Sequence, residues 1–164
     1  VGYTLEELDR PGEFNPEKAE LLNVPVGPLW GKLQKGQPVI SSDGKTVFPE
    51  DVMGKKRSGR KFSFVTDTLY KTSIAKEVYG SDLLVCEAMF ENDLIDQAKE
   101  KKHMTAREAA LIARDSNSLR MYMIHYSLRY NDKELEKLLL QAREIYPGAE
   151  LSKDRMCIDI PYVD

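Results

Sequence analysis

Two histidines and an upstream aspartate are the residues of this chain with the clearest capacity for chemistry. His103 begins a short polar motif after a basic stretch, and His125 begins another after an apolar run. Asp67 ends an earlier apolar run. Histidine and aspartate are common ligands of catalytic divalent metals. The three residues predict an active-site rim rather than a core, but they are too few to complete a metal site on their own.

The elements that must position these residues alternate along the chain from residue 61 onward. The predicted strands are 61–66, 83–86, 120–124 and 156–160, and the predicted helices are 71–78, 92–101, 105–116 and 132–145. A capping box of Thr105 and Glu108 opens the third helix. Leucines at helical spacing mark the fourth. Alternating strands and helices predict an α/β layer structure.

Polar residues follow three of the predicted strands. Asp67 follows the first, Glu87 the second and His125 the third. Because ligands gather at the carboxyl ends of strands in such sheets, we expect these side chains to share one edge. His103 precedes the helix that starts near Thr105, and the positive end of that helix favours a phosphate oxygen. We therefore also expect Thr105 to contact substrate.

Residues 1–60 are rich in turns. The sequence predicts a strand at 3–5, a short helix from Asn15 to about Leu22, and a hairpin between 38–40 and 46–48. Residues 25–31 are a turn-dense stretch. We expect a single domain over residues 1–164, with 1–60 as a turn-rich lead-in and 61–164 as the alternating part.

Composition describes an ordinary globular protein. Of the 164 residues, 41% are hydrophobic and 31% are charged, and the net charge of −3 offers no global attraction for nucleic acid. Basic patches at 55–61 and 99–102 suit a phosphate-bearing substrate, or are solvated loop charges. No apolar run approaches the roughly 18 residues that cross a bilayer. We expect no membrane association.

The cysteines indicate the cellular compartment of the protein, and the first residue indicates how the chain arose. Cys86 and Cys157 lie in apolar, strand-like runs, which predicts buried free thiols in a cytoplasmic protein rather than a disulfide framework. The chain starts at Val1 and not at methionine. We therefore expect a fragment, a processed product or an engineered chain.

Four ordered motifs resemble a known family. They are 66–68 (Thr-Asp-Thr), 86–90 (Cys-Glu-Ala-Met-Phe), 103–106 (His-Met-Thr-Ala) and 125–130 (His-Tyr-Ser-Leu-Arg-Tyr). In this order, and together with 9–14 and 27–36 upstream, they resemble the ribonuclease Z family. Its members are tRNA 3′-processing endonucleases of the metallo-β-lactamase superfamily. The resemblance covers nearly the whole chain.

The resemblance implies a site with two zinc ions, with manganese as the alternative. It assigns Asp67 as the ligand that bridges both metals and His125 as a terminal ligand. It assigns His103 to proton transfer or to holding the scissile phosphate, and Glu87 to orienting His103. Two adjacent metals generate a hydroxide near neutral pH and stabilise phosphate charge during in-line attack.

The chain also departs from the family pattern. The family's upstream His-x-His-x-Asp-His run is absent, as is the histidine ligand that follows it, and a chain with two histidines cannot supply them. Cys86 stands where the family usually has histidine, and Leu128 where it usually has proline. Arg129 is either a phosphate clamp or a structural salt-bridge partner.

We therefore expect the C-terminal half of a metallo-β-lactamase αββα sandwich, with a mixed β-sheet and helices on one face. The predicted function is metal-dependent cleavage of the 3′ trailer of precursor tRNA. The chain alone is expected to be inactive or weakly active, to need the missing N-terminal half, and to form a homodimer. The alternatives are another phosphodiesterase or hydrolase of the same superfamily, and a non-catalytic RNA-binding or assembly fragment.

Overall fold

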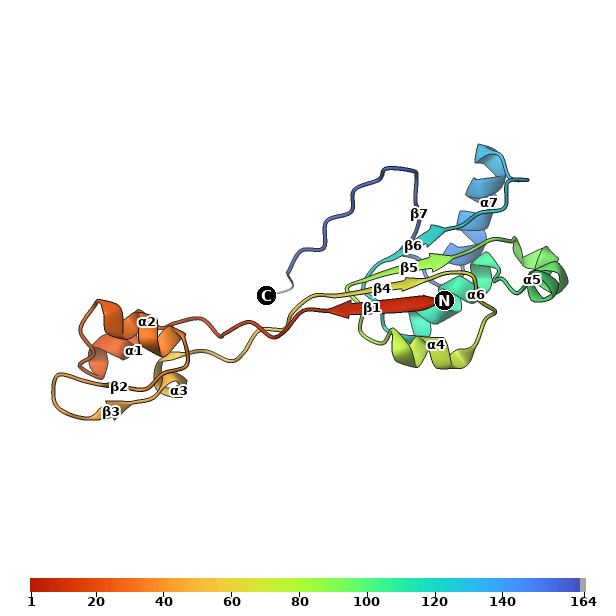
Figure 1. Cartoon of the computed structure of the whole chain (residues 1–164). Helices are drawn as coiled ribbons and strands as arrows, with labels where there is room; N and C mark the ends of the chain where they lie inside the picture. The colour runs from red at the N-terminus through yellow and green to blue at the C-terminus, as the bar shows by residue number, and fades with distance from the viewer. Residues whose placement is uncertain (163–164) are drawn as a thin grey trace. The chain divides into compact units, whose positions relative to one another are not determined.

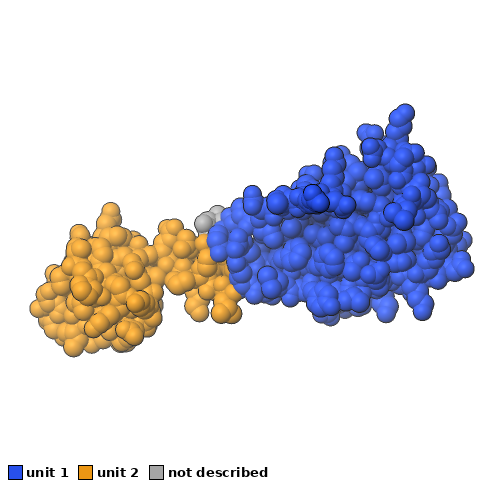
Figure 2. All heavy atoms as spheres, turned by 45° about the horizontal axis from the view of Figure 1, so that its top comes forward, with its two compact units in different colours: residues 1–7, 60–162 blue, residues 8–59, 163–164 orange. Residues whose placement is uncertain are grey.

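The computed structural model describes residues 1–162, which form two compact units (Figure 2). One unit comprises residues 1–7 and 60–162, and the other comprises residues 8–59. The second unit is thus inserted in the chain between two segments of the first. The prediction of a single domain over residues 1–164 stays a prediction. None of the helices over residues 1–162 has both the length and the apolar character that crossing a membrane demands.

A five-stranded mixed sheet forms the centre of the larger unit, in the order β1-β4-β5-β6-β7 (Figure 1). The edge strand β1 (Gly2–Glu6) pairs antiparallel with β4 (Lys61–Val65). The strands β5 (Leu83–Glu87), β6 (Met121–Ile124) and β7 (Ala149–Leu151) continue the sheet in parallel. Parallel neighbours end at the same edge, so the residues that follow β4, β5 and β6 lie together.

Helices follow the strands as the sequence predicts. They are α4 (Thr72–Glu77), the 3-10 turn η1 (Asn92–Leu94), α5 (Ile95–Lys101), α6 (Ala106–Asp115) and α7 (Asp132–Arg143). Side-chain caps define the last two helices. Thr105 caps α6 and Asn131 caps α7, each in a capping box with the glutamate three residues later. These caps satisfy backbone N–H groups that a helix start otherwise leaves unpaired.

The main core lies between the sheet and these helices. Its members from β5 and β6 are Leu84, Cys86, Met121 and Met123, which are buried with a run of alanines from α6. Alanine side chains let the helix backbone approach the sheet closely. The predicted α/β architecture with helices on one face is confirmed (Figure 1).

The opposite face of the sheet carries a smaller apolar cluster. Leu83, Val85 and Tyr122 are buried there, and Ile158 and Ile160 from the segment after β7 pack against them. Side chains alternate between the faces of a strand, so consecutive residues of β5 serve different cores.

One expected strand is absent and another takes its place. Residues 156–160 are not a strand, whereas β7 at Ala149–Leu151 completes the sheet. Isoleucines at alternate positions predict a strand, but here Ile158 and Ile160 are partly buried by packing on the sheet face. The prediction that Cys157 is buried is also wrong, because this side chain points to solvent.

The smaller unit has its own core. It contains α1 (Pro16–Leu21), α2 (Pro28–Gln34), α3 (Pro49–Val52) and a hairpin of β2 (Val39–Ile40) and β3 (Thr46–Val47). The core residues are Ala19, Val24, Leu33, Val39, Val47 and Val52. Each helix begins with proline, whose fixed φ suits the first turn. The short helix and hairpin are confirmed, but the stretch expected to be only turns contains the start of α2.

Candidate metal centre and active site

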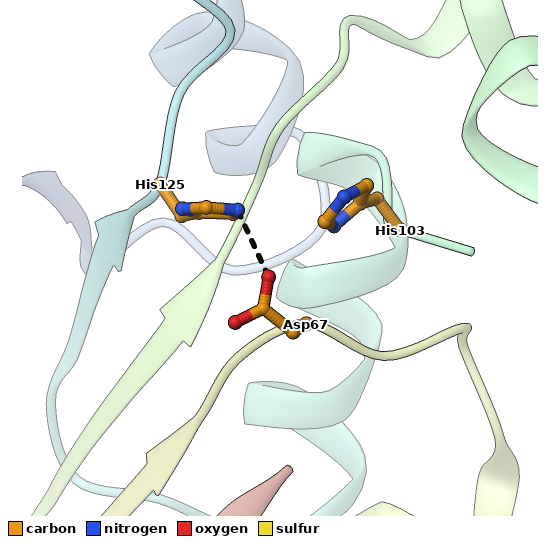
Figure 3. A group of neighbouring side chains, drawn as sticks. All are labelled: Asp67, His103 and His125. Carbon is orange, nitrogen blue, oxygen red and sulfur yellow. Dashed lines mark ion pairs between the residues drawn. The ribbon is translucent and has the colours of Figure 1, made fainter. Parts of the chain in front are cut away.

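Asp67 and His125 lie side by side at the carboxyl ends of β4 and β6. Nε2 of His125 is 3.2 Å from Oδ1 of Asp67, and Figure 3 shows the two side chains pointing toward each other. Both residues have left-handed backbone conformations, with φ of 48° at Asp67 and 60° at His125. This conformation is unfavourable for residues other than glycine. Both strands therefore end in a turn that directs a polar side chain to the shared edge.

His103 reaches the same place from the connection between α5 and α6. Lys102 ends α5 in a left-handed conformation, and the amide of His103 then donates to the carbonyl of Ala98 at 2.8 Å. The imidazole rings of His103 and His125 are 5.2 Å apart. In Figure 3 the two histidines flank Asp67 from opposite sides. The three residues singled out in the sequence are thus brought together.

Glu87 holds His103 in position. Its carboxylate is fully buried, with Oε2 at 3.0 Å from Nδ1 of His103. The amide of Met104 donates to the same oxygen at 3.2 Å, and the amide of Thr68 donates to Oε1 at 2.7 Å. With Nδ1 directed to the carboxylate, the other ring nitrogen, Nε2, remains for chemistry.

The geometry fits a divalent metal. One ligand atom each from Asp67, His103 and His125 lies within 4.8 Å of the others. Donor atoms around a tetrahedral zinc ion are about 3.4 Å apart, because each bond is roughly 2.1 Å long. The 3.2 Å contact between His125 and Asp67 is already in this range. A carboxylate behind a histidine, as Glu87 is behind His103, is the usual support of metal-site histidines.

Cys86 does not add a soft ligand to this group. Its side chain is fully buried beneath the helices. Burial, and next the charge of Glu87, raise the pKa of the Cys86 thiol. A protonated thiol is neither a nucleophile nor a good metal ligand. The sequence prediction that Cys86 is a buried free thiol is confirmed.

Thr105 has a structural role at the start of α6. It is 1% exposed, and its hydroxyl accepts from the amide of Glu108 and contacts that residue's carboxylate. The other amides of the first turn are also occupied, since Ala106 donates to the carbonyl of Phe90 and Arg107 to the side chain of Asn92. A substrate contact by Thr105 stays a prediction, and this helix end has no free amide to support it.

The two basic patches differ in their surroundings. In the first, Arg57, Arg60 and Lys61 lie within ion-pair distance of glutamates. These contacts favour the interpretation of structural or solvated charges there. In the second, the exposed Lys101 and Lys102 lie at the end of α5, directly before His103. Contact with a phosphate-bearing substrate stays a prediction for both patches.

Sequence reasoning missed the groups that support the site residues. The amides of Thr68 and Met104 bind Glu87, and backbone amides carry no signature in a sequence. Phe90 and Gln97 contact Arg129 from two other segments. Phe90 belongs to a motif that the sequence singles out, but Gln97 is an ordinary polar residue within a helix and nothing in the sequence marks it.

Comparison with known proteins identifies the family. The family model described as "Beta-lactamase superfamily domain" matches residues 38–126, and the chain belongs to this family. The metallo-beta-lactamase fold protein YhfI from Bacillus subtilis has a similar fold, with a TM-score of 0.52 at 21% identity. That likeness covers 57% of this chain and 37% of YhfI.

Proteins named ribonuclease Z are similar to this chain over its whole length. A protein of Treponema denticola named ribonuclease Z is 61% identical over 100% of this chain and 53% of its own length. Ribonuclease Z of Myxococcus xanthus is 45% identical over 100% of this chain and 53% of its own length. The chain therefore spans about half the length of the relatives that it matches.

Proposed function

We propose that this chain belongs to an endoribonuclease of the ribonuclease Z type, which hydrolyses a phosphodiester at the 3′ end of precursor tRNA. The observation that carries the proposal is the His103–Glu87 pair next to Asp67 and His125. The first pair suits proton transfer and the second suits metal binding. The identity to relatives named ribonuclease Z supports the same function.

Each residue has a role in this proposal. Asp67 and His125 would be the ligands that hold the metal ions. When bound, the metals supply an activated water and offset the charge of the phosphate. His103, protonated and held by Glu87, donates its proton to the departing ribose oxygen. Arg129 contributes a phosphate contact.

The chain alone has too few ligands for this chemistry. Catalytic zinc sites normally use three protein ligands for each ion, and two ions require more than Asp67 and His125 can provide. The remaining ligands are proposed to come from the polypeptide that corresponds to the other half of the relatives. Zinc is the proposed metal, with manganese as the alternative.

Cleavage of labelled precursor tRNA tests the proposal. We expect little product from the 164-residue chain with Zn²⁺ or Mn²⁺, and robust cleavage after co-expression with the remaining half of a relative. Strong cleavage by the chain alone would contradict the missing-half proposal. Hydrolysis of bis(p-nitrophenyl) phosphate but not of precursor tRNA would favour a phosphodiesterase for small substrates. Binding of tRNA without metal or cleavage would favour an RNA-binding or assembly module.

We also propose that the isolated chain forms a homodimer. In a two-sheet sandwich each sheet covers the inner face of the other. Within residues 1–162, the corresponding cluster around Val85 and Tyr122 is covered by the segment with Ile158 and Ile160. Size-exclusion chromatography with light scattering is expected to give twice the chain mass of 18.7 kDa. A stable monomer at all concentrations would contradict the homodimer.

A further inference from the structure

The hydroxyl of Tyr126 joins the ends of two neighbouring strands directly beside His125. It donates to the carbonyl of Met123 in β6, and it accepts from the amide of Ser152 at 3.0 Å. Ser152 directly follows β7, the strand that pairs with β6. One side chain thus closes the turn that contains His125 and also ties this turn to the next strand of the sheet.

The carbonyl of Met123 is the point at which these contacts meet. The hydroxyl of Ser152 donates to it at 2.7 Å, and the amide of Ser152 lies 3.0 Å from it. Two hydroxyl groups, one from Tyr126 and one from Ser152, therefore share an acceptor that has two lone pairs. We refer to these two side chains and the Met123 carbonyl as the Tyr126–Ser152 clamp.

His125 depends on its neighbours because its own conformation is unfavourable. Its φ of 60° lies in the left-handed region, which costs free energy for any residue with a Cβ. Such a conformation persists only where the surrounding structure determines it. The side chain of His125 is 38% exposed and its partner Asp67 is 58% exposed, so burial of the imidazole contributes little to holding the turn. The support must come from the chain on either side.

Two kinds of contact provide this support. The amide of Ala88 donates to the carbonyl of Ile124 at 2.9 Å, and the amide of Ser127 donates to the carbonyl of Met89 at 3.2 Å. Backbone groups make these contacts, so they do not depend on the identity of the side chains. The Tyr126–Ser152 clamp does depend on it, and it can therefore be removed by a single substitution.

The ring of Tyr126 fixes the place of its hydroxyl. The ring is partly buried and packs against the main core between the sheet and the helices. Folding has therefore already restricted the rotation of this side chain. Phenylalanine can occupy the same space but has no hydroxyl, so the packing of the ring and the hydrogen bonds of the hydroxyl can be separated by experiment.

We propose that Tyr126 and Ser152 position the metal ligand His125, by holding its turn in the left-handed conformation that directs the imidazole to Asp67. The proposal rests on the proposed function, in which His125 is a metal ligand. Tyr126 is a positioning residue, because it acts through His125 and does not itself touch metal or substrate. A ligand that is held in place before binding loses less freedom on binding, so the clamp raises the metal affinity.

Tyr126→Phe tests the proposal in the metal-free 164-residue chain. The Cα and Cβ chemical shifts of His125 report its backbone conformation, and in this variant we expect them to move from left-handed toward extended values. The Co²⁺ affinity of the chain is expected to fall roughly fivefold, as loss of one net hydrogen bond predicts. Ser152→Ala is expected to act in the same direction. Ser152→Thr keeps a hydroxyl and is expected to retain the wild-type shifts.

Tyr146→Phe is the matched control. The Tyr146 ring is also partly buried against the main core, and its hydroxyl donates to a backbone carbonyl, that of Ser118, at 2.8 Å. Ser118 precedes β6, whereas His125 follows it. The control is expected to lower the melting temperature but to leave the His125 shifts and the Co²⁺ affinity unchanged. Unmoved His125 shifts in Tyr126→Phe, or equal changes in Tyr146→Phe, would each overturn the proposal.

The complemented enzyme, formed by co-expression with the remaining half of a relative, gives a second measurement. Tyr126→Phe is expected to need roughly fivefold more metal than the wild type for half-maximal cleavage of precursor tRNA. Tyr146→Phe is expected to need the wild-type concentration. An equal metal requirement in Tyr126→Phe and the wild type would contradict the positioning role. An inactive complemented wild type would contradict the proposed function, whereas the His125 shifts judge the clamp independently of cleavage.

Discussion

Nδ1 of His103 lies 3.0 Å from Oε2 of Glu87, and the glutamate is fully buried while the histidine reaches the surface. A buried carboxylate is costly unless hydrogen bonds satisfy it. Here the His103 ring and the amides of Met104 and Thr68 do so. The contact therefore fixes the ring orientation of His103 and at the same time stabilises the junction of β5 with the start of α6.

Glu87→Gln tests both consequences of this contact. Glutamine retains the shape of glutamate but replaces one acceptor oxygen with an NH₂ group, which cannot accept a hydrogen bond. The one remaining oxygen cannot accept from all three donors. We expect the free energy of unfolding to fall by about 1–3 kcal/mol. The imidazole of His103 is expected to lose its preference for one tautomer, which the ¹⁵N shifts of the ring report. His103→Ala is the comparison variant, expected to keep the fold and to lose cleavage in the complemented enzyme. Unchanged ¹⁵N shifts in Glu87→Gln would show that Glu87 does not orient His103.

The left-handed backbone conformation at His125 lowers the stability of the fold, while the imidazole of the same residue serves metal binding. At φ 60°, a residue with a Cβ is strained by about 1 kcal/mol relative to glycine. His125→Gly and His125→Ala both remove the imidazole, so their difference isolates the backbone. We expect the glycine variant to be more stable than the alanine variant in chemical denaturation, and both to bind Co²⁺ more weakly than the wild type. Equal stability of the two variants would exclude backbone strain at this position.

Much of the site could be predicted because its residues follow strands. Asp67 and His125 follow the apolar runs that form β4 and β6, Glu87 is the last residue of β5, and parallel strands end at one edge. Their approach to His103 could not be derived from spacing. It depends on the left-handed turn at Lys102 and on backbone amides that bind Glu87, and neither has a reliable signal in the sequence.

The two errors in the predicted fold have the same cause, which is that a local sequence pattern is compatible with more than one structure. Residues 156–160 alternate like a strand, but their isoleucines are partly buried against a sheet face and make no ladder. Pro28 belongs to a turn-dense stretch, but proline also suits the first turn of a helix, and here it begins α2. In both cases the local pattern permits two structures, and packing at a distance decides between them.

Two leucines on α7 test the packing of the main core. Leu138 is fully buried between α7 and the rest of the core, whereas Leu140 on the same helix is 59% exposed. Leu138→Ala is expected to lower the free energy of unfolding by about 2–5 kcal/mol, through lost burial and a residual cavity. Leu140→Ala is expected to change it by less than about 0.5 kcal/mol. Urea denaturation measures both, and similar values would contradict the observed orientation of α7.

Glu7 links the end of β1 to the start of β4 and predicts a specific dependence on pH. Its carboxylate forms two hydrogen bonds with the guanidinium of Arg60, at 2.6 Å and 2.9 Å. Arg60 thereby lowers the pKa of Glu7 from 4.5 to about 2. Since the ionised form is favoured in the folded state, its contribution to stability is complete above pH 4.5 and disappears as the pH falls through about 2.

The difference in melting temperature between the wild type and Glu7→Gln isolates this contribution from other carboxylates. We expect the difference to be constant above about pH 5 and to shrink steadily toward pH 2. Glu6→Gln is the control, because its carboxylate is largely exposed and lies 3.7 Å from Lys61. Exposed pairs of this kind contribute little and are screened by salt. A Glu7→Gln difference that does not change with pH would mean that Glu7 acts through packing, because the loss of an ionic contact must follow the titration of the carboxylate.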